Sequence, residues 1–167
     1  STVQRVYSSI QGAPNHIRQF VDRMNTAAKV AAEDSGVPAK LILSQAALES
    51  GWGKREIMHA DGSTSHNLFG IKATPSWKGK TVEVMTTEYQ NGVARKMTQT
   101  FRAYDSYAES FADYARLIGN NKRYESVKHA ATPQEAAQRI QDAGYATDPS
   151  YAKQLIAIMA YFDGGKS

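Results

Sequence analysis

The chain has 167 residues, of which 41% are hydrophobic and 22% are charged, and it carries a formal net charge of +4 at pH 7. These proportions are those of an ordinary globular domain with a sizeable core. No run of about 18 apolar residues occurs, so the sequence predicts no membrane span. Cysteine is absent, which excludes disulfide bonds, thiol nucleophiles and cysteine-ligated zinc.

The positive charges are spread along the chain, without the long basic runs of a nucleic-acid-binding arm. A mildly basic surface still attracts anionic polymers such as cell-wall glycan, DNA or acidic lipid. We expect no metal site and no cofactor, because the sequence has no His-x-x-x-His pair, no phosphate-binding glycine loop and no Gly-x-Ser-x-Gly elbow. The scattered histidines are His16, His59, His66 and His129.

The composition along the chain predicts a single domain. We expect residues 1–13 to form a linker or N-terminal arm, residues 14–163 to form the domain, and residues 164–167 to be a frayed tail. The chain starts at Ser1 instead of Met and shows no signal peptide, which is typical of a piece excised from a longer protein.

Residues 14–36 form the first predicted helix, because apolar side chains recur there at i, i+3, i+4 and i+7. A second helix is expected to begin after Pro38 and to end at Gly51. Proline suits the first turn of a helix, and glycine commonly takes the left-handed cap after the last turn. Further helices are predicted over residues 106–118, 132–144 and 149–162.

The second helix carries a carboxylate on its apolar side. Leu41, Gln45 and Glu49 share one face, so Glu49 lies in the last turn, close to Trp52. Burial disfavours the charged form of a carboxyl group, and a glutamate whose pKa rises from about 4.3 to about 6 can act as a general acid. Glu49 is therefore a candidate proton donor. The alternative is a glutamate that pairs with a basic residue or reaches solvent.

Residues 54–76 are expected to be mainly irregular. Loops of this length are uncommon in compact domains and are usually functional or disordered. The segment 67–72 (Asn-Leu-Phe-Gly-Ile-Lys) contains apolar residues that would tie the loop to the core. We therefore interpret it as a functional loop.

Residues 81–104 change to alternating apolar and polar positions around Asn91-Gly92, which is the strongest short signal for a β-hairpin. Two strands alone are marginally stable, so the hairpin must lean on the helices. The predicted cross-strand pairs are Gln90 with Val93, Glu88 with Arg95, and Val82 with Phe101.

The hairpin supplies candidates for a second carboxylate, which glycoside hydrolysis usually requires beside the proton donor. Glu88, near the hairpin tip, is the stronger candidate. The alternative for Glu88 is an exposed ion pair with Arg95, worth less than about 1 kcal/mol. Glu83 is a weaker candidate, because it shares the Met85 face, opposite Val82.

Aromatic residues gather in the loops and at the element ends, where a ring with a polar tip can stack on a sugar. Trp52 has an alternative role in bracing the turn after Glu49, and we expect Phe111, Tyr114 and Tyr151 to fill the core. The candidate substrate-binding residues are Trp52, Asn67, Phe69, Trp77, Tyr104 and Tyr107.

Several segments together resemble glycoside hydrolase family 73, bacterial peptidoglycan hydrolases of the N-acetylglucosaminidase type, and most closely its flagellar member. In that member a hydrolase domain follows a rod-cap domain. The resemblance covers residues 14–162. It is carried by residues 47–53, 67–72, 77–79, 87–89, 101–104 and 143–149.

The resemblance implies an α+β, lysozyme-like fold, with a mostly helical lobe, a small β-hairpin lobe and a substrate groove between them. It implies that Glu49 is the general acid, that the hairpin closes Glu88 over the groove as the second acidic group, and that Tyr145 positions substrate or water. The implied reaction is hydrolysis of the peptidoglycan glycan strand at the β-1,4 bond after N-acetylglucosamine.

The resemblance also implies a biological setting. The enzyme would open the wall for the flagellar rod, act in the periplasm without a cleavable signal peptide, and meet rod proteins through an N-terminal domain outside this chain. No nucleic acid and no cofactor is expected. The alternatives are a muramidase, a lytic transglycosylase (whose usual Gly-Leu-Met-Gln stretch is missing), a non-catalytic glycan-binding module, and a basic DNA-binding protein.

Overall fold

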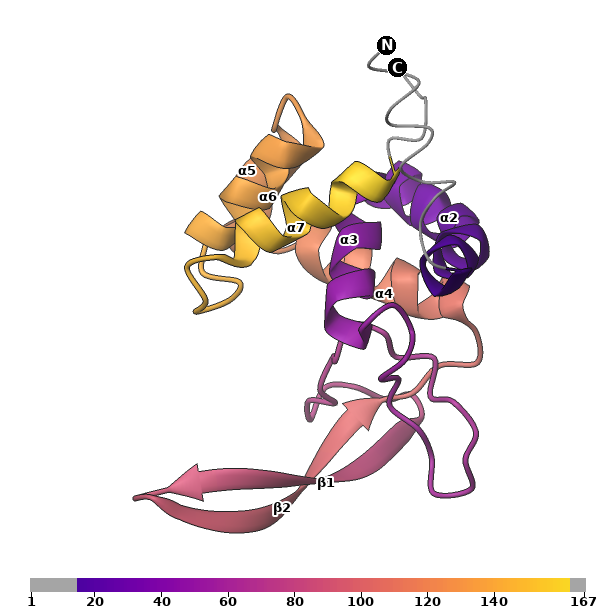
Figure 1. The fold of residues 1–167 in the computed structure, drawn as a ribbon, viewed down its shortest axis with the longest axis vertical. Coiled ribbons are helices and arrows are strands. Elements are labelled where there is room, and N and C mark those ends of the chain that lie inside the picture. Colours follow the sequence, from indigo (N-terminus) through magenta and orange to yellow (C-terminus); the bar gives the residue numbers. More distant parts are fainter. Residues whose placement is uncertain (1–14, 163–167) are drawn as a thin grey trace.

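The computed structural model describes residues 15–162, which form a helical lobe and a long β-hairpin that projects from it (Figure 1). The predicted arm at residues 1–13 and tail at residues 164–167 lie outside the described residues. The predicted α+β arrangement of a helical lobe and a small hairpin lobe is confirmed.

The helices follow the periodic segments of the sequence. All five predicted helices are present, and the short stretch between α4 and α6 adds helical turns that the sequence did not predict. The elements are α2 (Asn15–Ser35), α3 (Ala39–Ser50), α4 (Tyr107–Gly119), η1 (Lys122–Tyr124), α5 (Glu125–Lys128), α6 (Pro133–Asp142), α7 (Tyr151–Met159) and η2 (Ala160–Phe162).

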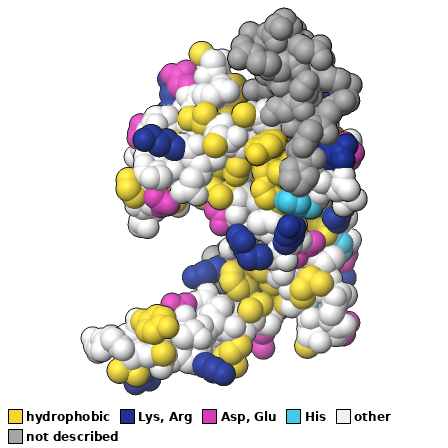
Figure 2. Space-filling model, in the orientation of Figure 1, with side chains coloured by type: hydrophobic (Ala, Val, Ile, Leu, Met, Phe, Trp, Pro, Cys, Tyr) yellow, Lys and Arg dark blue, Asp and Glu magenta, His cyan; other side chains and the backbone are white. Residues whose placement is uncertain are grey.

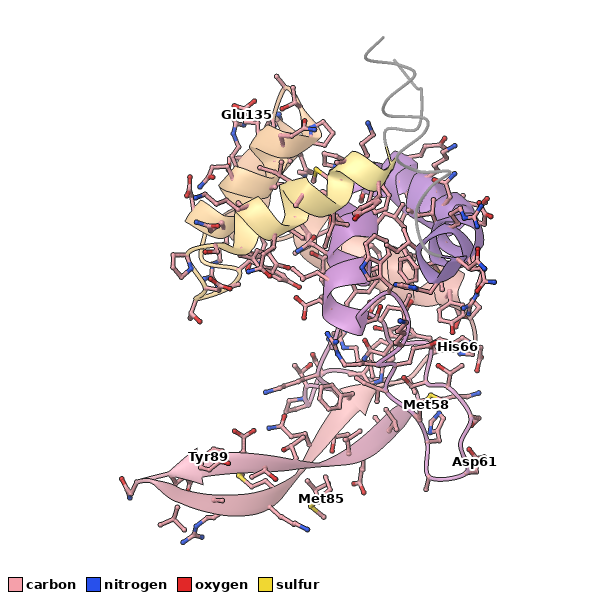
Figure 3. The ribbon with its side chains drawn as sticks, viewed as in Figure 1. Met58, Asp61, His66, Met85, Tyr89 and Glu135 are labelled. Atoms are coloured by element: carbon pink, nitrogen blue, oxygen red, sulfur yellow. The ribbon has the colours of Figure 1, made fainter. Side chains whose placement is uncertain are left out.

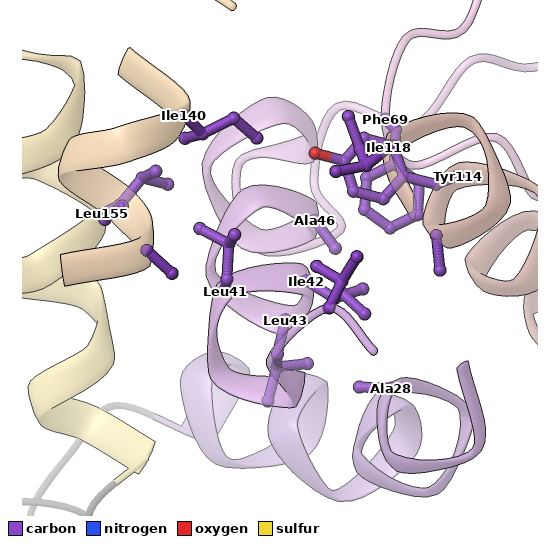
Figure 4. Packing of buried hydrophobic residues seen from close by; sticks show 14 of the residues in the cluster. Ala28, Leu41, Ile42, Leu43, Ala46, Phe69, Tyr114, Ile118, Ile140 and Leu155 are labelled. Atoms are coloured by element: carbon purple, nitrogen blue, oxygen red, sulfur yellow. The ribbon is translucent and has the colours of Figure 1, made fainter. Parts of the chain in front are cut away.

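Helix α3 forms the centre of the helical lobe. Every side chain from residue 41 to residue 47 is buried, because α2, α6 and α7 all pack against this helix (Figure 4). The face that the sequence predicts to point inward is buried at Leu41 and Gln45, although Glu49 at its end is exposed, and the opposite face of residues 41–47 is buried as well. Ile140 and Leu155 cover one side of α3, while Phe69 and Tyr114 lie across the other. The core fixes α3 on all sides.

The end of α3 agrees with the prediction. Gly51 takes a left-handed conformation with φ of 59°, and the Trp52 N–H donates to the Ala47 carbonyl at 2.8 Å. This arrangement satisfies a carbonyl of the last turn that would otherwise have no partner. Glu49 is therefore held in the final turn of a buried helix.

The hairpin consists of β1 (Thr81–Gln90) and β2 (Val93–Arg102) and forms a two-stranded antiparallel sheet. Its turn places Asn91 and Gly92 at φ of 53° and 77°, which suits the tight turn that an Asn-Gly pair favours. The predicted register is confirmed at all three positions: Gln90 with Val93, Glu88 with Arg95, and Val82 with Phe101.

A hollow, called the groove below, separates the hairpin arm from the helical lobe (Figure 2). The lobes are joined at the base of the hairpin, where Val82 is buried and Lys72 bridges to Phe101. Leu68 and Phe69 are also buried, so the loop that contains them is tied to the core as predicted.

A buried ion pair joins the base of the hairpin to α4. Arg102 donates to Asp113 at 3.0 Å, and the two side chains are only 10% and 11% exposed. The Tyr104 hydroxyl donates to the same carboxylate oxygen at 2.5 Å. Arg102 also lies over the Trp77 ring, 4.6 Å from its centroid. These contacts hold the hairpin lobe against the helical lobe.

Asp113→Ala would leave the Arg102 guanidinium buried without its carboxylate partner. Breaking one side of a buried pair is strongly destabilising, so we expect the free energy of unfolding to fall by about 3 kcal/mol. Urea unfolding followed by circular dichroism measures this change. Lys80→Ala is the control, because it breaks an exposed pair with Asp105 and should leave stability unchanged. Equal stability of both variants would contradict the role of the buried pair.

Candidate active site

Glu49 is partly exposed at the end of α3, where it lies beside aromatic side chains of the helical lobe. The Tyr151 hydroxyl, from the start of α7, donates to Glu49 Oε2 at 3.2 Å. Burial raises the pKa of the Glu49 carboxyl group, and this effect exceeds the lowering caused by the Tyr151 hydrogen bond. The predicted upward shift is confirmed in direction, which makes Glu49 suitable as a proton donor.

A hydrogen-bond relay leads from the core to Glu49. Gln45, one turn earlier in α3 and fully buried, accepts a hydrogen bond from the Tyr114 hydroxyl. The Gln45 amide then donates to the Tyr151 oxygen at 3.2 Å. Because Gln45 supplies the proton in that contact, the single hydroxyl proton of Tyr151 remains for Glu49. The relay therefore orients one carboxyl oxygen and leaves the other without a described hydrogen bond.

Tyr145 lies beside this relay, in the loop between α6 and α7. Its ring stacks on Tyr151 with centroids 5.6 Å apart and meets the Tyr114 ring edge-on at 6.3 Å. Burial and the nearby Glu49 charge raise the pKa of Tyr145, so its phenol stays protonated at neutral pH. Arg123 holds the loop by donating to the Gly144 carbonyl at 2.9 Å. Tyr145 is thus a fixed hydrogen-bond donor near Glu49.

Glu88 lies on the half-buried face of β1 and accepts a hydrogen bond from Gln99 at 3.0 Å. Within residues 15–162, no ion pair joins Glu88 to Arg95, so that alternative is not formed, and no contact joins Glu88 to Glu49. Glu83 is exposed on the opposite face of the strand. The hairpin therefore carries Glu88 as a carboxylate without a cationic partner.

The outer face of the hairpin is open to solvent. Met85 and Tyr89, 62% and 75% exposed, lie along the arm well away from the helices (Figure 3). The arm beyond its base is therefore held mainly by its own strand pairing.

Three of the predicted substrate-binding residues make structural contacts. Trp52 packs edge-on against Phe20 at 5.7 Å, so it braces the turn after Glu49, as its alternative interpretation stated. Phe69 is buried and stacks on Tyr114 at 4.1 Å. Asn67 is 1% exposed.

The side-chain amide of Asn67 forms its hydrogen bonds with backbone groups. It donates to the carbonyls of Ile71 and Arg102, each at 2.9 Å, and accepts from the Phe69 and Ile71 N–H groups. These four contacts leave none of its hydrogen-bonding capacity for a sugar. Its function is to shape the loop and join it to β2.

The other three predicted substrate-binding residues surround the base of the hairpin. Trp77 and Tyr104 line a cavity of about 400 Å³ beside α4. The Tyr107 hydroxyl donates to Glu56 at 2.6 Å. In the part of the chain that is described, none of the three contacts Glu49.

Sequence reasoning missed the partners of Glu49. Tyr114 and Tyr151 were expected only to fill the core; they are buried as expected, but their hydroxyl groups also build the relay. The available signal was the i, i+4 spacing that places Gln45 on the same face of the helix as Glu49.

The described residues contain no group of three or more histidine, cysteine, aspartate or glutamate side chains that could hold a metal ion. Within the same range, no helix is both long and apolar enough to cross a membrane.

Tyr151→Phe removes the hydrogen bond that favours the charged form of Glu49. The pKa of Glu49, already raised, should rise further, so the carboxyl group should stay protonated to a higher pH. An NMR titration of the Glu49 side-chain carboxyl carbon measures this midpoint. Tyr107→Phe, which removes a hydroxyl bound to Glu56, should not move it. A midpoint that is unchanged or lower in Tyr151→Phe would contradict the assigned relay.

Comparison with known proteins gives the family of the chain. The family model Glucosaminidase, described as mannosyl-glycoprotein endo-beta-N-acetylglucosaminidase, matches residues 25–164. The peptidoglycan hydrolase FlgJ of Salmonella typhimurium is 51% identical over 142 residues, covering 85% of this chain and 45% of the relative. The exo-glucosaminidase LytG of Bacillus subtilis is 35% identical over 149 residues, covering 86% of this chain and 51% of the relative.

Solved structures agree with these relatives. The glycoside hydrolase domain of Salmonella typhimurium FlgJ, in a C-terminally truncated form, matches with a TM-score of 0.78 and 50% identity, covering 86% of this chain and 95% of that one. The chain spans about half the length of the curated relatives that it matches. The lysozyme-like fold and the resemblance to glycoside hydrolase family 73 are confirmed, and the chain belongs to the glucosaminidase family.

Proposed function

We propose that this chain hydrolyses the glycan strand of bacterial peptidoglycan at the β-1,4 bond after N-acetylglucosamine. The observation that carries the proposal is Glu49, a carboxyl group with a raised pKa in the last turn of a helix whose core-facing part is buried and whose end points toward the hairpin (Figure 1). The family and the relatives named peptidoglycan hydrolase support the same substrate.

In the proposed mechanism, Glu49 donates its proton to the glycosidic oxygen that leaves. The Tyr151 hydrogen bond orients Oε2, so Oε1 carries the proton toward the substrate. General acid catalysis of this kind contributes about 10²–10⁴ in rate. Proton donation weakens the C–O bond while positive charge builds on the sugar ring.

Glu88 is proposed as the second carboxylate, which approaches from the hairpin side of the groove. It would act as a base on the attacking water or stabilise the positively charged sugar ring. The absence of a cationic partner within residues 15–162 keeps its charge available for this role. The other route is attack by the sugar's own acetamido group, with the protonated Tyr145 steadying that group.

The relatives named FlgJ support a flagellar setting. We propose that the enzyme acts in the periplasm, where local cleavage of the wall lets the flagellar rod pass. A neighbouring domain outside this chain would bind rod proteins and restrict cleavage to that place.

Glu49→Gln keeps the size of the side chain and removes the acid, so turnover of purified peptidoglycan should fall about 10²–10⁴-fold. Mass spectrometry of borohydride-reduced digests gives both the rate and the cleaved bond. Reduced glucosamine ends from the wild type support the proposal. Reduced muramic acid ends indicate a muramidase, and anhydro-muramic ends a lytic transglycosylase. Full turnover by a folded Glu49→Gln variant would remove Glu49 from the mechanism.

Glu88→Gln should lose most of the turnover and retain the same thermal unfolding temperature, because the side chain keeps its size and its partner Gln99. Glu83→Gln, on the opposite face of the strand, is the matched control and should be fully active. Initial rates on the same peptidoglycan measure both variants. Wild-type rates from Glu88→Gln would favour attack by the acetamido group instead.

A further inference from the structure

Three adjoining cavities lie along α4, and we call them together the trough. Its first section is the cavity of about 400 Å³ beside Trp77 and Tyr104. The second section, a hollow of about 610 Å³, shares Asp113 and Arg116 with the first. Because neighbouring sections share lining residues, they adjoin one another along α4.

The trough reaches the candidate active site at its other end. A third section, of about 270 Å³, shares Leu117 and Asn121 with the second and is also lined by Tyr114 and Tyr145. Both tyrosines belong to the group around Glu49. Helix α4 passes behind α3 in Figure 1. A branched ligand in the groove could send its branch into this trough.

The middle section of the trough, the hollow of about 610 Å³, is positively charged. Arg116 is 63% exposed, and its only ion pair among the described residues is a long one of 3.7 Å to Asp113. The Asp113 charge is already matched by Arg102, so Arg116 is an excess positive charge. Lys122 lines the same section. This middle section of the trough therefore favours a carboxylate group of the ligand.

The far section adds a carboxylate at the outer end of the trough. Asp105 is paired with Lys80 at 2.5 Å, whereas Glu109 forms no ion pair among the described residues; Arg116, seven residues further along α4, also lines this section. Glu109 accepts a hydrogen bond from the Asp105 N–H at 2.8 Å, so its carboxylate is held in place at the beginning of α4. This end of the trough favours an amine.

We propose that the trough binds the peptide stem of peptidoglycan; this rests on the proposed function. The stem branches from the muramic acid next to the cleaved bond. In stems that contain a diamino acid, a free carboxylate comes before the free amine along the peptide. Arg116 nearer the groove and Glu109 beyond it match that order.

The length of the trough fits a stem of ordinary size. From Leu117 to Glu109 the helix rises about 12 Å, at 1.5 Å per residue. An extended peptide covers about 3.3–3.6 Å per residue, so three to four residues span this distance. The Trp77 ring in the outermost section would then pack against the end of the stem.

The test compares two substrates that differ only in their stems. One is glycan strands with peptide stems, and the other is the same strands after an amidase has removed the stems. Arg116→Gln should lower kcat/KM about tenfold on the strands with stems, because it removes a charge-assisted hydrogen bond, and leave cleavage of the bare strands unchanged. Arg116→Lys should recover part of the loss.

Lys29→Gln is the control, since it removes an exposed charge on α2, which does not line the trough. Equal losses on both substrates would make the trough a glycan subsite, and no loss on either would remove Arg116 from recognition. Both results overturn the proposal.

A second measurement separates this proposal from the proposed function. If the wild type cleaves neither substrate, the free stem peptide is added to the labelled protein and amide shifts are recorded by NMR. Shifts at residues 112–121 that weaken in Arg116→Gln support a stem site even then. Absence of shifts there, or shifts that Arg116→Gln leaves unchanged, overturns it.

Discussion

The burial of α3 on every side is the constraint that positions the candidate active site. Residues 41–47 have almost no exposed surface, so the helix cannot turn or slide without uncovering apolar area or breaking the Gln45 relay. Its last turn therefore emerges at a fixed place, and the left-handed Gly51 stops it there. A proton donor must stay within a fraction of an ångström of its target, and a buried helix meets that requirement better than a loop.

The second lobe is fixed only at its base. At that base, Arg102 and Tyr104 make buried hydrogen bonds to Asp113 of α4. In contrast, every β2 side chain from residue 93 to residue 98 is exposed. Regions with few buried contacts have the lowest local stability. One carboxylate thus lies on a rigid helix and the other on an arm with few buried contacts, a difference that the proposed closure of the hairpin over the substrate would use.

Local patterns were enough to predict the five longer helices, the hairpin register and the position of Glu49 in the last turn of α3. Asn91-Gly92 sets the register by itself, because the tight turn allows only one pairing. The roles of Asn67 and Tyr151 could not be predicted. Tyr151 meets Glu49 across 102 positions in the chain, and an asparagine in a loop has the same sequence signal whether it binds a sugar or its own backbone. Such pairings are decided by packing between distant segments.

Two opposing effects act on Glu49, and the proposed chemistry needs both. Burial alone would favour the protonated form and make release of the proton to the leaving oxygen less favourable. The Tyr151 hydrogen bond alone would hold it ionised, with no proton to give. The structure combines a larger raising effect with a smaller lowering one. An acid that gives up its proton and regains it in every cycle works best when its pKa lies near the pH of its surroundings, and the phenol beside the carboxylate sets that balance.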